Sequence, residues 1–466
     1  MSETNKTLDK PVTLGFLLKF AWPTIIGTLI MGSFMIVDSI FVSRFLGQIE
    51  LSAVNIVMPF QMFAIALGFM LGIGGNALAA KEVGEGNLKQ ASKIFSLILV
   101  SAFLISALFS SVAIFFPNLV LNLLGVDDSL RDVAHTYMGP IAFGLPLIVL
   151  SSVFQQFFMT EGKASIGATA AALGGIVSAG LNWLFLSHFG FGLASTAVAT
   201  VIGSSIATLA GIAYFAFKKG GTLHFVKPTF DFEILKRSTL NGFSEFMAMI
   251  SGAIVSTITN NIIMDVGGWE GLAAFAVIFA TTGILSNLVM GYVSGILPII
   301  SFNYGKGDTE NLSKTYSGSL RIIAALSIIA VIATWLLADP FIRIFVDPYM
   351  YTLNEATGMY HYVQNTIYAL AFEGYFIMTS SLLFFGLNNF GSMFFTSLNN
   401  AKVSTILSFL RTFVFVIGAL LVLPAIFGME GVFFAMVTAE ILAAIATIIA
   451  FSVMNKKYGY KKMKTA

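Results

Sequence analysis

The chain has 466 residues, of which 57% are hydrophobic and only 10% are charged, whereas soluble globular domains carry roughly 25% charged residues. This composition excludes an ordinary soluble domain and predicts a polytopic membrane protein. The chain contains no cysteine, which excludes disulfide bonds and thiolate chemistry. We expect no cleavable signal peptide, because the first apolar run is too long for one.

A membrane-spanning helix needs roughly 20 predominantly apolar residues. Twelve runs of this kind occur, so we predict an all-α polytopic membrane protein with 12 transmembrane helices. In chain order, the runs lie near residues 14–43, 51–80, 94–117, 133–159, 165–187, 191–217, 236–265, 272–303, 315–337, 356–387, 397–423 and 431–454.

The distribution of Lys and Arg indicates the orientation. If the N-terminus lies in the cytoplasm, nearly all of the 25 basic residues fall on the cytoplasmic side. Only Arg44, Arg131 and Arg343 then fall outside, and Arg411 lies within the membrane. Because cytoplasmic loops carry the excess of Lys and Arg, we predict that both termini are cytoplasmic.

The two halves of the sequence resemble each other. Gly84-Glu85-Gly86-Asn87 matches Gly305-Lys306-Gly307-Asp308 at an offset of 221 residues and at the same place within each half. Similar glycine-rich turns are the alternative, but turn chemistry does not produce a shared offset. Six spans in each half make the repeat parallel. We predict an N-lobe at 1–222 (helices 1–6) and a C-lobe at 223–466 (helices 7–12) around a central cleft.

Five ionisable residues lie deep within apolar runs: Asp38, Glu245, Glu373, Arg411 and Glu440. A charge at bilayer depth costs about 2.5–3.5 kcal/mol, so such residues usually face a water-filled cavity or one another and handle ions or substrate. Four acids against one base favour protons, metal cations or organic cations as cargo. The alternative for the glutamates is a structural ion pair with Arg411, which can satisfy only one of them fully. For Asp38, the alternative is an interfacial carboxylate that reaches headgroup water.

Together, these features resemble the multidrug and toxic compound extrusion (MATE) family of the polysaccharide-flippase (MOP) superfamily, over essentially the whole chain. The resemblance is carried by Pro23 followed by Asp38, the turn at 84–87, residues 194–200, and residues 241–246, which are typical of one bacterial branch. It implies secondary active efflux of amphipathic, preferentially cationic compounds in exchange for H⁺ or Na⁺. The expected location is a bacterial or archaeal cytoplasmic membrane.

The resemblance also implies two ion-coupling sites. In the N-lobe, Asp38 matches the acid of helix 1, and Asn182 stands where helix 5 often carries a second acid. In the C-lobe, Glu245 matches the acid of helix 7 and Glu373 falls at or one residue from the acid of helix 10; this pair could also bind Na⁺. Because an amide cannot share a proton with a carboxylate, we expect the C-lobe acids to carry at least part of the coupling.

Other polar residues within the spans are candidates for the substrate cavity. We predict that Gln155, Gln156, Glu440 and Arg411 line it, although interhelical hydrogen bonds are the common alternative for such glutamines. Pro23 removes one helical hydrogen bond and can kink helix 1. The kink could serve as a gate or only as a packing feature.

The alternative function within the superfamily is a flippase for lipid-linked oligosaccharide or polysaccharide. Such a protein should place Arg or Lys against a pyrophosphate headgroup, and a single membrane arginine against four acids argues against it. The sequence contains no phosphate loop and no metalloprotease motif, so we expect no enzymatic activity and no cofactor apart from H⁺ or Na⁺ as coupling ion. We expect a monomer whose partners are small amphipathic drugs, organic cations and membrane lipids, and no nucleic acid.

Overall fold

A computed structural model describes residues 8, 10–128, 130–218, 221–354 and 359–460, apart from the side chains at 31–44, 48, 51, 350–354, 359–361 and 363. Long apolar runs form helices because a helix pairs its own backbone groups where no water can do so. The first half contains α2 (Leu14–Phe45), α3 (Gln48–Gly84), α4 (Leu88–Phe115), α5 (Pro117–Leu123), α6 (Arg131–Thr160), α7 (Ala164–Trp183), the π-helical segment η1 (Leu184–His188) and α8 (Ala194–Phe217).

The second half is also helical, except for one β-hairpin. It contains α9 (Phe232–Lys306), α10 (Thr309–Leu336), α11 (Ala338–Arg343), β1 (Tyr349–Asn354), β2 (Met359–Gln364), α12 (Thr366–Thr379), α13 (Leu382–Ser397), α14 (Ala401–Phe409), the π-helical segment η2 (Leu410–Val414) and α15 (Phe415–Tyr458).

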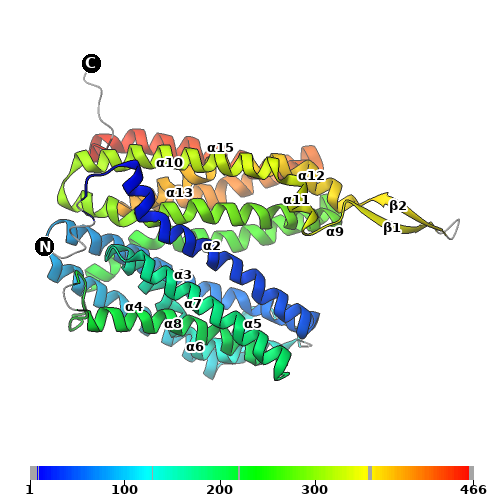
Figure 1. The fold of residues 1–466 in the computed structure, drawn as a ribbon, viewed down its shortest axis with the longest axis horizontal. Coiled ribbons are helices and arrows are strands. Elements are labelled where there is room, and N and C mark those ends of the chain that lie inside the picture. Colours follow the sequence, from blue (N-terminus) through cyan, green and yellow to red (C-terminus); the bar gives the residue numbers. More distant parts are fainter. Residues whose placement is uncertain (1–7, 9, 129, 219–220, 355–358, 461–466) are drawn as a thin grey trace, which may run out of the picture.

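The helices form two groups, one from each half of the chain (Figure 1). The groups lie against each other at the end of the molecule where the chain begins and ends, and they diverge toward the opposite end. Helix α2 starts beside the second group and runs toward the far end of the first. The described part of the chain therefore has two lobes, which we call the N-lobe and the C-lobe.

Glycines let the two lobes touch backbone to backbone. A Cβ added to Gly84 of α3 would lie 2.1 Å from the carbonyl oxygen of Phe302, and one added to Gly305 of α9 would lie 2.1 Å from that of Lys81. Gly84 and Lys81 in α3 correspond to Gly305 and Phe302 in α9 by the same offset of 221 residues as the sequence repeat, so the two contacts are equivalent. The two helices therefore cross around a local two-fold axis.

Similar approaches extend this contact along α2, α3 and α9. A Cβ on Gly74 would lie 1.9 Å from the Ser238 carbonyl oxygen, and one on Gly242 would lie 1.9 Å from the Met70 carbonyl oxygen. Small residues at such crossings let membrane helices pack closely. The glycine seam, as we call this set, comprises Gly74, Gly84, Gly242, Gly291, Gly295 and Gly305.

The two longest helices each contain a residue with left-handed geometry. Gly268 in α9 has a φ of 60° and Gly428 in α15 a φ of 59°, and glycine adopts such angles without steric cost. In the N-lobe, Gly47 precedes Gly268 by the repeat offset of 221, and Gly190 precedes the last N-lobe helix as Gly428 precedes the last span; both also have positive φ. Each of these two long helices is therefore two helices joined at a glycine, and the repeat extends to the backbone.

Eight helices of the described residues are long and apolar enough to cross a membrane, or nine if α12 and α13, bent by 45° at their junction, form one span. This supports a multi-pass membrane protein. The breaks at Gly268 and Gly428 divide two of these helices further. The count of 12, like the lobe boundary between residues 222 and 223, stays a prediction.

The span expected at 356–387 is wrong at its start. Residues Met359–Gln364 form β2, which pairs antiparallel with β1 and places Tyr349 opposite Gln364. Helix α12 begins only at Thr366, after Asn365, whose side chain accepts a hydrogen bond from the backbone N–H of Ile367 at 3.0 Å and so caps the helix. Outside this hairpin, which projects from the diverging end (Figure 1), the described elements are all helices.

The linker that leaves the N-lobe packs back onto it. The Glu161 carboxylate accepts hydrogen bonds from the backbone N–H groups of Thr222 and Leu223 at 2.9 and 3.1 Å. The ring of Phe225 lies 5.3 Å from that of Phe95, centroid to centroid. The linker is therefore fixed to the N-lobe by both polar and aromatic contacts.

The segment that leaves the C-lobe does the same. The ring of Tyr460 lies 4.9 Å from that of Tyr316, and its hydroxyl donates to the Phe451 carbonyl oxygen at 2.8 Å. Tyr316 follows Phe95 by the repeat offset of 221. Three further rings surround each centre: Phe154, Phe157 and Phe215 around Phe95, and Phe390, Phe394 and Phe451 around Tyr316.

Candidate functional site

The N-lobe contains a cavity of about 190 Å³ between α6, α7 and α8. Its walls are aromatic rings, small residues, hydroxyls and one amide, with no charged side chain: Ser151, Ser152, Phe154, Gln155, Phe158, Gly167, Ala170, Ala171, Gly174, Gly175, Ser178, Thr200, Gly203, Ser204 and Ala207. The hydroxyl of Ser178 is buried and has no hydrogen-bond partner in the described structure. This cavity suits an uncharged group that combines apolar surface with hydrogen-bonding atoms.

The two glutamines predicted for the substrate cavity differ. Gln155 lines the N-lobe cavity. Gln156 is not among the lining residues and is only 3% exposed. Its side chain packs against Gly72 of α3, where an added Cβ would meet the Gln156 Cγ at 3.2 Å. Gln156 therefore lies in the packing between α6 and α3.

The predicted N-lobe ion site is only partly described. Asp38 belongs to α2, but its side chain lies outside the described ones. Asn182 is buried on α7, one turn after Ser178, and is not among the residues that line the cavity. Pro23 lies inside α2, which continues through it. A few residues later, the Thr28 hydroxyl donates to the backbone carbonyl of Asn287 in α9 at 2.9 Å, so this stretch of α2 is held against the C-lobe.

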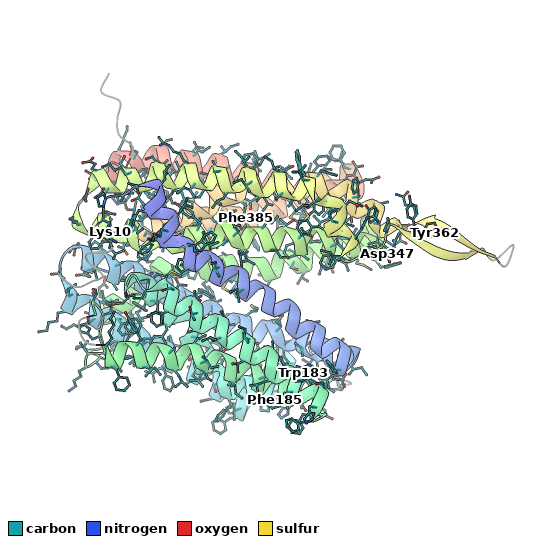
Figure 2. The ribbon with its side chains drawn as sticks, viewed as in Figure 1. Lys10, Trp183, Phe185, Asp347, Tyr362 and Phe385 are labelled. Carbon is teal, nitrogen blue, oxygen red and sulfur yellow. The ribbon has the colours of Figure 1, made fainter. Side chains whose placement is uncertain are left out.

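In the C-lobe, two charged side chains and one amide, from three elements, gather inside the bundle. Arg411 of η2 lies 4.0 Å from Glu440 of α15, measured from Nη1 to Oε1, and the two side chains are 11% and 16% exposed. The Asn388 amide of α13 donates to the Glu440 carboxylate at 2.5 Å and to the Glu440 backbone carbonyl at 2.9 Å. The guanidinium of Arg411 lies 5.7 Å from the ring of Phe385, which Figure 2 shows among the helices of the C-lobe.

Glu245 of α9 lies close to η2, because the hydroxyl of Ser408, three residues before Arg411, donates to the backbone carbonyl of the neighbouring Ser244 at 2.8 Å. The Glu245 side chain is half-buried, and its charged form is attracted by Arg411. One guanidinium thus serves two carboxylates, Glu245 and Glu440, and if all three are ionised the C-lobe cluster (Glu245, Asn388, Arg411 and Glu440) carries one net negative charge.

Glu373 is not part of this cluster. Its side chain is exposed on α12, and it forms no hydrogen bond or ion pair with the described residues. Glu440 contacts Arg411 and Asn388, and Glu373 contacts neither of these two residues. The structure therefore groups two of the three predicted C-lobe acids and leaves the third apart.

Sequence reasoning missed Asn388. It lies with Asn389 in a helix made mostly of apolar and aromatic residues, and a pair of amides at bilayer depth is a signal that could have drawn attention to it. It also missed Glu161, which is 1% exposed and lies in a short turn beside Gly162 and Lys163. There a solvent-exposed charge is the ordinary expectation.

Comparison with known proteins shows to which family the chain is similar. Residues 23–184 and 246–421 match the MatE family. The chain is 23% identical over 444 residues to the multidrug export protein MepA of Staphylococcus saprophyticus, covering 93% of this chain and 92% of that protein. It is 21% identical over 453 residues to MepA of Staphylococcus aureus, covering 95% and 94%.

Solved structures share the fold. A crystal structure of MATE in complex with MaL6 superposes with a TM-score of 0.88 at 20% identity, covering 98% of this chain and 100% of the other. The outward-facing conformation of a multidrug resistance MATE family transporter of the MOP superfamily superposes with a TM-score of 0.86 at 20% identity, covering 98% and 99%. At this identity, the likeness establishes the two-lobe helical architecture.

Proposed function

The chain belongs to the MatE family, and from this premise we propose that it is a multidrug efflux transporter that exchanges amphipathic, preferentially cationic compounds for H⁺ or Na⁺. Its similarity to multidrug export proteins over nearly the whole chain supports the proposal. The observation that carries it is the C-lobe cluster, where, among the described residues, Glu245 and Glu440 share the guanidinium of Arg411 inside an apolar bundle.

The orientation is part of the proposal. The basic residues indicate that both termini lie in the cytoplasm. The glycine seam then closes the cytoplasmic side, and the lobes diverge toward the outside (Figure 1). The outward-facing structure to which the chain is similar has the same fold. In this conformation, a compound would be released outward and a coupling ion would enter from outside.

The chemistry of exchange follows from charge. The net negative charge of the C-lobe cluster attracts a monovalent cation to Glu245, and a proton or Na⁺ that binds there removes the attraction. The two cations then compete for one carboxylate, which is what an antiporter requires. The uncharged N-lobe cavity suits the neutral, aromatic part of an amphipathic compound. Asp38 and Asn182 remain proposed as a second ion site, and Glu373 as a further C-lobe acid.

Transport in proteoliposomes tests the proposal. Ethidium, a lipophilic monovalent cation, serves as substrate, and a pH gradient or a Na⁺ gradient is imposed alone. We expect one gradient to drive ethidium transport and Glu245→Gln to abolish it. Glu233→Gln is the matched control, because Glu233 lies on the same helix but is exposed and paired with Arg237 at 2.9 Å. An anionic dye of similar size should not be transported, and ethidium transport by neither gradient would contradict the proposal.

A further inference from the structure

Glu440 is held rigidly on one side. The Asn388 amide donates to both its carboxylate and its backbone carbonyl, at 2.5 and 2.9 Å. The hydroxyl of Thr447 donates to the Asn388 side-chain oxygen at 3.4 Å and so orients the amide. A carboxylate with these contacts keeps its position whether or not a cation lies beside it.

Arg411 is held loosely. A guanidinium offers five N–H donors, yet its nearest distance to Glu440 is 4.0 Å, beyond hydrogen-bonding range. The Arg411 Nε is buried without a hydrogen-bond partner in the described part of the chain, and the Phe385 ring gives only a weak contact at 5.7 Å. Arg411 also belongs to η2, and π-helical turns often occur at functional sites. Few contacts are lost if this side chain moves.

We propose that Arg411 is a tethered counter-ion that alternates between the two carboxylates. It stays beside Glu440 while a cation occupies Glu245, and it takes the place of the cation at Glu245 when the cation leaves. This inference rests on the proposed function, because it assumes that Glu245 binds the transported or coupling cation. Glu440 and Arg411 are then positioning residues, and Glu440 acts by keeping Arg411 away from Glu245.

The inference predicts an unusual pattern of binding. In Glu440→Gln, Arg411 has only Glu245 as a partner and should block it. In Arg411→Gln, two carboxylates lack a counter-ion, so a cation should bind at least as tightly as in the wild type but leave slowly. In the double variant, Glu245 is free again, and binding should return. Two unit charges 4 Å apart interact by about 4 kcal/mol at an effective dielectric constant of 20, which is ample for these effects.

The test measures ethidium binding to the purified full-length protein by fluorescence anisotropy. We expect Glu440→Gln to weaken binding by about tenfold or more, and the double variant Arg411→Gln with Glu440→Gln to return to within about threefold of the wild type. Arg411→Lys keeps a tethered cation and should bind ethidium as the wild type does. The matched control removes the exposed pair Glu233 and Arg237 by the same substitutions and should leave binding unchanged.

The binding results can contradict the alternating counter-ion directly. The inference is overturned if Glu440→Gln binds ethidium like the wild type, or if the folded double variant binds no better than Glu440→Gln alone. A purely structural ion pair predicts that second result, because it gives no reason for rescue. If the double variant does not fold, Arg411→Met with Glu440→Gln makes the same prediction, since an apolar side chain often replaces a buried ion without loss of stability. If the wild type itself binds no cation, the proposed function fails and not only this step.

Discussion

Replacing Gly74 by alanine should drive the protein away from the conformation described above. The new Cβ would lie 1.9 Å from the Ser238 carbonyl oxygen and 2.7 Å from the Gly242 nitrogen. Both are backbone atoms, so no side-chain rotation relieves the clash. A carbon and a carbonyl oxygen approach to about 3.3 Å, so α3 and α9 must separate by about 1.4 Å at this point.

The free-energy cost of this clash should destabilise only the conformation in which the glycine seam is closed. Overpacking a tight contact costs about 1–3 kcal/mol, and rocking of the lobes would open the glycine seam in the alternative conformation. A difference of that size changes the ratio of two conformations by about 5- to 150-fold. The alanine variant should therefore populate the conformation in which the seam is open and the opposite ends of the lobes approach each other.

Distance measurements between spin labels read this shift directly. The chain has no cysteine, so cysteines introduced at Trp183 and Asp347 are the only ones. Both positions are exposed and lie at the diverging end of their lobes (Figure 2). We expect a long distance in the wild type and a shorter population in Gly74→Ala. Gly252→Ala is the matched control, because its Cβ would meet no atom within 4 Å. An unchanged distance distribution and melting temperature in Gly74→Ala would refute the reasoning.

Three further predictions concern single side chains. Glu373→Gln should impair ethidium efflux less than Glu245→Gln, since Glu245 interacts with the shared arginine and Glu373 does not; equal loss would contradict the grouping seen here. The Tyr368 hydrogen bond lowers the pKa of Asp339 below its ordinary value of 3.8, so this contact stabilises the fold above that pH and is lost as the pH falls through the lowered pKa. Tyr368→Phe should raise the Asp339 pKa measured by carboxyl NMR titration, and an unchanged midpoint would show that the hydroxyl has no effect. Glu161→Ala removes an ionised acceptor worth about 1.5–3 kcal/mol and should speed hydrogen exchange of the Thr222 and Leu223 amides by about tenfold or more; unchanged protection would mean that other contacts hold the linker.

The periodic features of the sequence predicted the fold well. Runs of apolar residues predicted the helices, and the offset of 221 residues reappears in the contacts of Gly84 and Gly305. The hairpin was missed because Tyr, Met and Val are apolar in a helix or a strand alike. Its second strand, β2, runs so directly into α12 that length alone suggested one span. Pairing between two strands depends on backbone register, which composition does not reveal.

The candidate site was only partly predictable. The cost of burying charge predicted that Arg411 would meet an acid, and the structure places its guanidinium 4.0 Å from the Glu440 carboxylate. It could not predict which acids, because Glu245, Glu373 and Glu440 lie at similar depth in their apolar runs. Their separation depends on the direction each helix faces, which the packing of α9, α12 and α15 determines.

The contacts of the linker have a consequence for how the chain is divided. Phe225 completes the ring cluster of the N-lobe as Tyr460 completes that of the C-lobe, so each bundle is closed by its own trailing segment. Only residues 227–231 then separate the last linker contact with the N-lobe, made by Val226, from the start of α9. A chain cut within this stretch would give two polypeptides that each keep a complete cluster, and the two should assemble when produced together. A cut before Phe225 would instead leave this ring on the polypeptide that contains the C-lobe, so the N-lobe cluster would be incomplete.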